Sequence, residues 1–313
     1  MAAPLVEDFN PGFDWDSLVA DLRQGKCIPF IGAGATEGIL PPGAELAREL
    51  AAEAHRYFRD PTNLAAVTQE LAAHYRDGVR PKTRAAQRLA KRLLAHAQDG
   101  AALPKLMTLL ARQARLEVYL TTNYDDLIER SLGQAGRAAR SEICRWNRLL
   151  KSEDSVFDTG YRPTAADPVV FHLHGRFGYE AVPGGDPIVT GEQSMVLTEN
   201  DYLDFLVNVA WDVAGASPVA GPAVLPKAIV TQMTRKTLLF IGYGLEDINF
   251  RVIMRALVNS LELANQRLNV AVQLARSSAN ERAALAAYLE WTLKVKVFWG
   301  NADDFYQQLS ARL

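Results

Sequence analysis

Asn123 and Asp125 are side chains whose types and spacing suggest chemistry. They follow Thr122, which closes an apolar stretch at residues 117–122. The asparagine amide offers two N–H donors and one acceptor, whereas the aspartate only accepts hydrogen bonds. Such a pair can contact a sugar or an amide. Taken alone, the same side chains would more simply cap the helix expected at residues 125–132, and both interpretations stay open.

A pair of histidines ends another apolar stretch, residues 168–173, and precedes Gly175. His174 lies at the boundary with the glycine, where a ligand has room, and an imidazole titrates close to neutral pH. We therefore favour a functional role for His174, for which proton transfer is suitable chemistry. Strand alternation would put His172 on the same face as His174. Two nearby histidines also suit zinc, although no third ligand is evident locally. We interpret His172 as a packed core residue.

Glycine-rich turns follow two further apolar stretches, residues 27–31 and 237–241. Their sequences are Gly32-Ala33-Gly34-Ala35-Thr36 and Gly242-Tyr243-Gly244-Leu245, and Asp247 stands close behind the second. Glycine lets the backbone approach a phosphate or a sugar closely and leaves amide N–H groups free to donate. The first turn is not the dinucleotide fingerprint, because Gly38 comes one residue late, and it lacks the lysine of a P-loop. When each motif is taken alone, a tight turn, with Asp247 as a helix cap, explains it as well.

Short apolar stretches alternate with helix-like segments and must position these residues. The expected strands are residues 27–31, 117–122, 168–173, 237–241, 268–274 and 295–299. The expected helices are residues 14–25, 125–132, 198–213, 222–235, 247–264, 278–288 and 303–313. Continuous apolar strands alternating with helices predict an α/β protein with a doubly wound parallel sheet. Ligands of such sheets bind at the carboxyl ends of the strands, where all four motifs stand.

A long helical stretch separates the first two expected strands. Residues 44–58, 62–76, 82–97 and 104–115 each fit a helix, and no strand-like run interrupts them. We expect one domain at residues 14–313, interrupted by a helical insertion at residues 43–115. Such helices usually cover a sheet or each other. An oligomer surface or a lid over the site are the functional alternatives.

Composition excludes several classes of protein. The chain has 313 residues, 49% of them hydrophobic and 22% charged, which is typical of a globular protein. A net charge of −2 provides no general attraction to nucleic acid or anionic membranes. The two cysteines, Cys27 and Cys144, cannot form a disulfide framework or a zinc module of four thiolates. With no signal peptide or membrane-spanning run in the sequence, we expect a cytoplasmic protein.

Taken together and in this order, the four motifs resemble the sirtuin family. Sirtuins carry G-A-G-x-S, then T-x-N-x-D, then H-G, then a glycine turn of the form G-T-S-L. Here the corresponding segments begin at Gly32, Thr121, His174 and Gly242. The resemblance extends from Gly32 to Leu245 and agrees with the Rossmann-like fold expected from the strands.

The resemblance implies that the ligand is NAD. Gly32, Ala33 and Gly34 would then cradle the pyrophosphate. Asn123 and Asp125 would hold the nicotinamide ribose and orient a water molecule, and His174 would be the general base. The remaining cofactor-binding positions implied by the four motifs are Thr36, Thr122, Gly175, Gly242, Tyr243, Gly244 and Asp247.

Departures from the family pattern indicate a branch. Protein deacylases of the family carry a zinc module of paired C-x-x-C motifs, for which this chain lacks the cysteines, so we expect no zinc. Tyr243 and Gly244 also stand where deacylases have Thr and Ser. The pattern resembles the sirtuin-like NADases of bacterial anti-phage defence, which hydrolyse NAD, and it implies a homo-oligomer or a HerA-type ATPase as partner. A protein deacylase, an ADP-ribosyltransferase and a non-catalytic sensor of NAD or ADP-ribose remain the alternatives.

Overall fold

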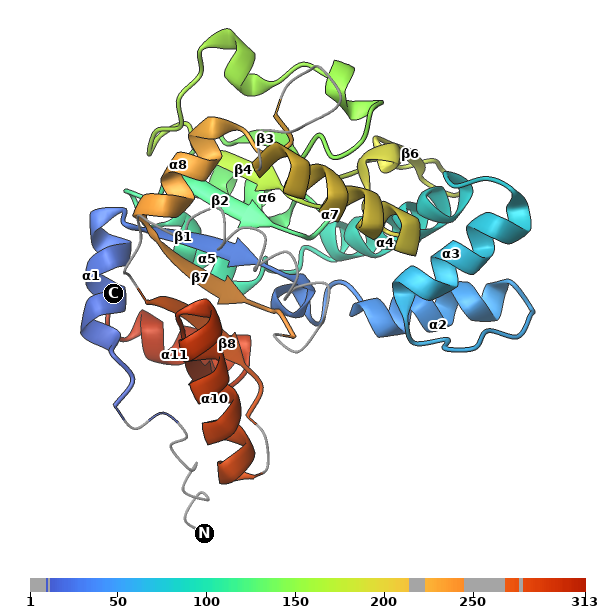
Figure 1. Cartoon of the computed structure of the whole chain (residues 1–313). Helices are drawn as coiled ribbons and strands as arrows, with labels where there is room; N and C mark the ends of the chain where they lie inside the picture. Colours follow the sequence, from blue (N-terminus) through green and yellow to red (C-terminus); the bar gives the residue numbers. More distant parts are fainter. Residues whose placement is uncertain (1–9, 11, 214–222, 245–267, 276–277) are drawn as a thin grey trace.

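The computed structural model contains one seven-stranded parallel sheet at its centre (Figure 1). It describes residues 10, 12–213, 223–244, 268–275 and 278–313. The strands are β1 (Cys27–Ile31), β2 (Val118–Thr121), β3 (Arg140–Ile143), β4 (Val169–His172), β7 (Thr237–Ile241), β8 (Asn269–Gln273) and β9 (Val295–Trp299). All pairings within this sheet are parallel.

The strand order identifies where a ligand should bind. The order across the sheet is β3-β4-β2-β1-β7-β8-β9. Apart from the edge strand β3, this is the 3-2-1-4-5-6 order of the Rossmann fold, with β1 and β7 on either side of the point where the chain reverses direction across the sheet. The α/β class with a doubly wound, Rossmann-like sheet is therefore confirmed. The loops after β1 and β7 flank the crevice in which such sheets bind ligands.

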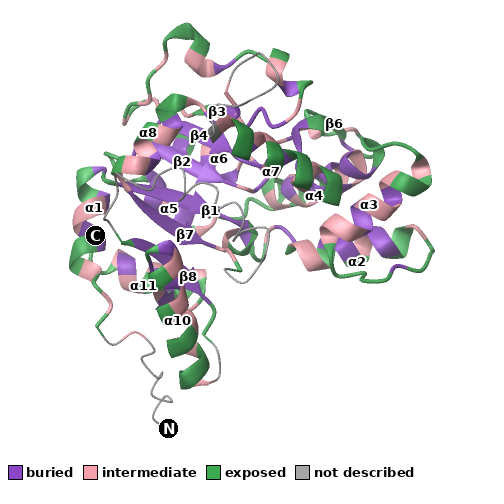
Figure 2. Ribbon diagram, viewed as in Figure 1, coloured by how far each residue is buried: buried purple, intermediate pink, exposed green. Residues whose placement is uncertain are grey.

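Helices cover both faces of the sheet. One face packs against α1 (Trp15–Gln24), α5 (Lys105–Ala111), α6 (Leu127–Gln134) and α11 (Ala302–Ser310). The other face packs against α7 (Glu199–Val213), α8 (Lys227–Arg235) and α10 (Ala279–Leu293). Within β1, Cys27 and Ile31 join the first core, and Ile28 and Phe30 join the second. Figure 2 shows the central strands buried while the outer faces of α7 and α10 are exposed.

Residues 43–115 contain four helices and no strand. They are α2 (Gly43–Glu53), α3 (Leu64–Tyr75), α4 (Arg80–Gln98) and α5. In Figure 1, α2, α3 and α4 lie beyond the tips of β1 and β2. The basic residues of α4 pair with carboxylates: Arg88 with Glu49 and Glu53, and Lys91 with Asp186. The helical character expected for this segment is confirmed.

Sequence patterns placed most helix boundaries within a few residues. Gly25 ends α1 in the left-handed conformation, with φ 71°, and Ser278 caps α10 by accepting a hydrogen bond from the Glu281 amide. The helix expected at residues 247–264 lies outside the described residues. No helix in the described part of the chain is both long and apolar enough to cross a membrane.

Three strands were not expected from the sequence. Edge strand β3 has the sequence Arg-Ser-Glu-Ile and only one buried residue, so it lacks the apolar run of a central strand. Strands β5 (Gly178–Glu180) and β6 (Ile188–Thr190) form a small antiparallel hairpin with little buried surface. Neither pattern differs enough from a loop to be recognised in the sequence.

Candidate active site

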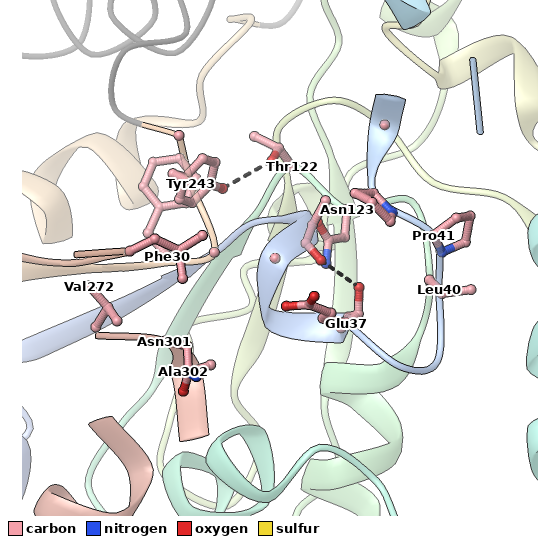
Figure 3. A pocket seen from close by; sticks show the side chains of 18 of the residues that line it. Phe30, Glu37, Leu40, Pro41, Thr122, Asn123, Tyr243, Val272, Asn301 and Ala302 are labelled. Atoms are coloured by element: carbon pink, nitrogen blue, oxygen red, sulfur yellow. Dashed lines mark hydrogen bonds between the residues drawn. The ribbon is translucent and has the colours of Figure 1, made fainter. Parts of the chain in front are cut away.

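A pocket of about 650 Å³ lies at the carboxyl end of the sheet (Figure 3). This volume is within the ordinary range for small-molecule sites. Most of the site residues expected from the sequence line it: Ala33, Gly34, Thr36, Thr122, Asn123, Asp125, His174, Gly242, Tyr243 and Gly244. Asp247 lies outside the described residues. The structure therefore brings all four motifs together in one pocket.

Asn123 links the loop after β2 to the loop after β1. Its backbone N–H donates to the Thr121 hydroxyl at 2.9 Å, and its side-chain Nδ2 donates to the Gly32 carbonyl at 3.3 Å. The residue is only 8% exposed although it lines the pocket. Its side chain does not cap α6, so this alternative is excluded for Asn123.

Asp125 both caps a helix and lines the pocket. Its Oδ1 accepts the N–H of Leu127, the first residue of α6, at 3.0 Å. Asp125 thus satisfies the first N–H of α6, as a capping role requires, although Asp126 is the N-cap residue, and the carboxyl group still lines the pocket. Burial, with a smaller contribution from the charge of Glu129, outweighs the lowering effect of the Leu127 hydrogen bond and raises the pKa of Asp125 to about 6. The group is mainly ionised at neutral pH and becomes protonated in mild acid.

His174 follows β4 in a turn and is buried at the pocket. Its ring stands edge-on to Tyr202 and Phe205 of α7, with centroid distances of 5.3 and 5.5 Å. Its Nε2 atom is buried and has no hydrogen-bond partner in the described part of the chain. Burial lowers the pKa of His174 to about 3, so the imidazole is neutral at physiological pH. A buried polar atom without a partner usually marks a functional site or a missing ligand.

The two glycine turns pack tightly against each other. The Gly32 amide donates to the Ile241 carbonyl at 2.8 Å, and the Gly34 amide donates to the Gly242 carbonyl at 3.0 Å. The expectation that these amides are free to donate is therefore wrong for Gly32 and Gly34. Gly242 has φ 79°, and a Cβ there would lie 2.3 Å from the Ala35 nitrogen. Glycine is required here because two backbone turns meet.

Tyr243 holds the wall of the pocket between these turns. Its hydroxyl donates to the Ile31 carbonyl at 2.8 Å and accepts the Thr122 hydroxyl proton at 3.0 Å. Figure 3 shows this tyrosine and Thr122 joined across the pocket wall. The ring packs edge-on against Phe30, with centroids 5.3 Å apart. The side chain thus connects the ends of β1, β2 and β7.

Gly175 supports His174 from behind the pocket wall. Its φ is 78°, and a Cβ at this position would lie 2.1 Å from the Ser194 carbonyl oxygen. The Val196 amide then donates to the His174 carbonyl at 2.9 Å. The segment around Ser194 and Val196 therefore fixes the turn that carries His174.

His172 is buried, as the core interpretation predicts, but it is not merely packed. Its Nε2 lies 2.8 Å from Glu129 Oε1, on the α6 side of the sheet. The strand ends at His172, so alternation stops there and His174 instead contacts α7. The expectation that the two rings share a face is therefore wrong.

Sequence reasoning missed several residues of the site. Tyr202, Gln273 and Asn301 line the pocket from α7, from the end of β8 and from the cap of α11. The helices after β1 also contribute, through Leu46 and Leu89. Gln273 is the polar last residue of an apolar strand, so its position was a usable signal, whereas apolar residues on helices give no such indication.

Within the described residues, no group of three or more His, Cys, Asp or Glu side chains is arranged to hold a metal ion. Cys27 and Cys144 are both buried and belong to the cores on opposite faces of the sheet. Burial raises the pKa of each thiol. The cysteines are therefore structural residues of the two cores.

Comparison with known families connects this geometry to a known domain. A family model described as a SIR2-like domain matches residues 117–292. The chain belongs to the SIR2-like family. The match extends from β2 into α10, so it includes Asn123, Asp125, His174 and the turn at Gly242. SIR2-like domains are typically NAD-dependent enzymes, which links this SIR2-like chain to NAD chemistry. No curated protein matches the sequence.

Proposed function

We propose that this SIR2-like chain hydrolyses NAD to nicotinamide and ADP-ribose. The observation that carries the proposal is the convergence of Asn123, Asp125 and His174 on one pocket beside two glycine turns. These three side chains provide an amide, a carboxylate and a neutral imidazole at the carboxyl end of a Rossmann-like sheet. That combination suits the cleavage of a glycosidic bond by water.

The lining of the pocket suits a dinucleotide. It includes the turns at Gly34 and Gly242, Asn123, and residues at the ends of β8 and β9. The turns leave no side chain at Gly34, where a Cβ would lie 3.0 Å from the Gly242 Cα. The buried Nε2 of His174 without a partner is the polar atom that a bound ligand or water would satisfy. We propose Gly32, Ala33, Gly34, Thr36, Thr122, Gly175, Gly242, Tyr243, Gly244 and Asp247 as the NAD-binding residues.

The protein must stabilise positive charge at the ribose carbon as the bond breaks. When bound, NAD supplies a glycosidic bond whose leaving nitrogen is already cationic, so nicotinamide departs without an acid. The ionised Asp125 carboxylate and the Asn123 amide oxygen provide negative potential inside a buried pocket, where it is only weakly screened. An apolar lining alone could not do this.

His174 is the group that can take up a proton. The ring is neutral at physiological pH, so one of its two nitrogens has a free lone pair, and we propose that this nitrogen is Nε2, which has no partner within the described residues. In the proposed reaction this nitrogen accepts a proton from the attacking water and passes it to solvent. A pKa of about 3 makes the ring a weak base, and a carboxylate or a ribose hydroxyl next to it would strengthen it.

The decisive experiment incubates the purified protein with NAD and follows nicotinamide and ADP-ribose by HPLC. We expect cleavage that Asn123→Ala and His174→Ala each abolish while the far-UV circular dichroism stays unchanged. Nicotinamide release that strictly requires an acylated peptide would indicate a deacylase instead. Tight NAD binding without turnover under all activating conditions would indicate a sensor, and either result would overturn the proposal.

We further propose an anti-phage role, in which NAD depletion in the cytoplasm stops the infected cell from supporting the phage. The support is the sequence resemblance to defence NADases. The same resemblance suggests a homo-oligomer or a HerA-type ATPase as the regulating partner. We expect phage-infected lysate, or the products of neighbouring genes, to raise the rate of NAD cleavage. If neither changes the rate and expression of the chain gives no protection, the defence role is wrong.

A further inference from the structure

His172 lies directly behind the candidate active site. It is the last residue of β4, in register with Thr121 of β2 on one side and with Ile143 of β3 on the other. Its side chain is fully buried. The ring therefore sits at the carboxyl end of the sheet, next to the loop that carries Asn123.

Both ring nitrogens of His172 face hydrogen-bond acceptors. Nδ1 lies 3.2 Å from the backbone carbonyl oxygen of Asn123, and Nε2 lies 2.8 Å from Glu129 Oε1. A carbonyl oxygen can only accept, and an ionised carboxylate can only accept. A neutral imidazole has a single N–H, so it can satisfy one contact but not both.

Glu129 is ionised in this environment. Its burial raises the pKa of the carboxyl group, but the charge and hydrogen bond of His172 outweigh it, with help from Ser141 and Arg176, and lower the pKa to about 2. The Ser141 hydroxyl donates to Oε1 at 2.5 Å, and Arg176 Nη1 lies 4.0 Å from the same oxygen. Buried carboxylates are usually paired and hydrogen-bonded, and His172 Nε2, at 2.8 Å, is closer to Oε1 than the Arg176 guanidinium.

We propose that His172 is a positioning residue, an imidazolium that donates one N–H to Glu129 and the other to the Asn123 carbonyl and so fixes Asn123 for the reaction. The catalytic consequence rests on the proposed NAD hydrolysis, whereas the charge state of the ring does not. The charged and titratable groups around the ring are Glu129 and Asp125 on the α6 side and Arg176 after β4. The two carboxylates favour the cation, and Arg176 offsets part of their effect.

The hydrogen bond from His172 completes a set of three that hold Asn123 in place. The Thr121 hydroxyl accepts its N–H, the Gly32 carbonyl accepts its side-chain N–H, and His172 donates to its carbonyl. With all three groups held, the amide has little freedom to rotate away from the pocket. Precise placement of this kind matters because a shift of about 1 Å in a reacting group can lower a rate about 100-fold.

The charge state of His172 is tested directly by NMR on the intact protein labelled with ¹⁵N-histidine. At neutral pH we expect both nitrogens of His172 to carry protons, with the signals assigned by their loss in His172→Gln. His174 in the same spectrum is the internal reference, and we expect it to show one unprotonated nitrogen. An unprotonated nitrogen on His172 at neutral pH would overturn the proposal whatever the activity.

The positioning role is tested by two conservative variants. In His172→Asn, the new amide nitrogen takes the place of Nδ1 and keeps the bond to the Asn123 carbonyl. In His172→Gln, the amide nitrogen takes the place of Nε2 and keeps only the bond to Glu129. We expect kcat of His172→Gln to fall about 10- to 100-fold with KM changed less than about threefold, and His172→Asn to recover most of that loss.

The possible outcomes separate this proposal from the proposed function. Equal losses of kcat in both variants, with equal losses of thermal stability, would reduce His172 to a structural residue. Unchanged kcat in both variants would also overturn the positioning role. If the wild-type protein does not cleave NAD at all, the proposed function fails, while the NMR measurement still decides whether the buried ion pair exists. A variant that does not fold leaves the NMR measurement as the deciding one.

Discussion

His172 and His174 stand two residues apart, are both buried, and differ in almost every other respect. His172 has acceptors at both ring nitrogens, one of them a carboxylate. His174 has a buried Nε2 with no partner among the described residues, and its ring packs edge-on against two aromatic rings. The first environment favours a fixed cation, and the second favours a neutral ring at the pocket. Burial by itself therefore does not determine what a histidine does.

The difference arises from where the strand ends. His172 is held in the ladder between β2 and β3, so its ring must point toward α6. His174 lies in the turn before Gly175, whose φ of 78° redirects the chain toward Ser194. One ring belongs to the scaffold and the other to the pocket. A protein can thus place a supporting group and a candidate base within one short segment.

The largest expected effect is that of His174→Ala. If this ring is the general base, its loss should lower kcat/KM for NAD cleavage about 100- to 10,000-fold. The protein should stay folded, because no hydrogen bond of Nε2 to the described residues is lost, although the cavity left beside Tyr202 and Phe205 lowers its stability. Measurement of NAD cleavage together with thermal unfolding checks both points. A loss of less than about tenfold would remove the contrast between the two histidines.

Gly175→Ala should destabilise the turn that carries His174 and leave the surroundings of His172 unchanged. A Cβ would clash with the Ser194 carbonyl and would also require an unfavourable positive φ, so we expect a loss of about 2–4 kcal/mol in the free energy of unfolding. Urea unfolding measures it. The matched control is Gly184→Ala, where φ is 72° but nothing lies within 4 Å, and it should cost about 1 kcal/mol.

The same variant tests whether the two environments are independent. We expect the NMR signals of His174 to move in Gly175→Ala while those of His172 stay in place, because the strand ladder holds the second ring. If both sets of signals move together, the two histidines form one structural unit and the comparison fails.

The central sheet was predictable because buried parallel strands have a strong sequence pattern. Cys27–Ile31, Thr237–Ile241 and Val295–Trp299 were expected at the bounds that they have in the structure. Edge strand β3 was not, because Arg140 is exposed and the one buried residue, Glu142, is a charged side chain that pairs with Arg145, so no apolar run marks the strand. Burial on both faces produces the apolar pattern. An edge strand lacks that burial, so its sequence does not show the pattern.

The site was predictable where residues follow a strand directly. Asn123, Asp125 and His174 were expected and do line one pocket, because the carboxyl ends of parallel strands meet at one edge. Glu129 was not expected, since a glutamate on a helix is usually exposed. Its importance comes from a pairing across the fold with His172, and sequence spacing does not contain that information.

Asp125→Asn should raise the stability of the protein at neutral pH and lower its activity. The folded-state pKa of about 6 is above the unfolded value of 3.8, so the carboxyl group stabilises the fold only while protonated. The ionised form therefore costs stability, and this cost grows as the pH rises from about 4 to about 6. We expect the variant to be about 1–3 kcal/mol more stable than wild type at neutral pH and similar at about pH 4, as measured by urea unfolding.

The activity of Asp125→Asn tests whether this carboxylate acts in the pocket. We expect wild-type kcat/KM to fall below about pH 6, as Asp125 becomes protonated, and the variant to lose about 100-fold at neutral pH with no such acid limb. Asparagine can still accept the Leu127 N–H, so the helix cap is retained. A variant that is less stable than wild type at neutral pH would show that the carboxylate serves the fold and not the site.

The smallest expected effect is that of Ser141→Ala, which changes the surroundings of Glu129, the partner of His172. The hydroxyl donates to the Glu129 carboxylate, which also accepts from His172 and lies near Arg176. Because those two cations remain, we expect a loss of about 1–2 kcal/mol in unfolding free energy and a change in kcat of less than about twofold. Both nitrogens of His172 should stay protonated. A loss of kcat as large as that of His172→Gln would mean that the carboxylate, rather than the imidazolium, holds Asn123 in place.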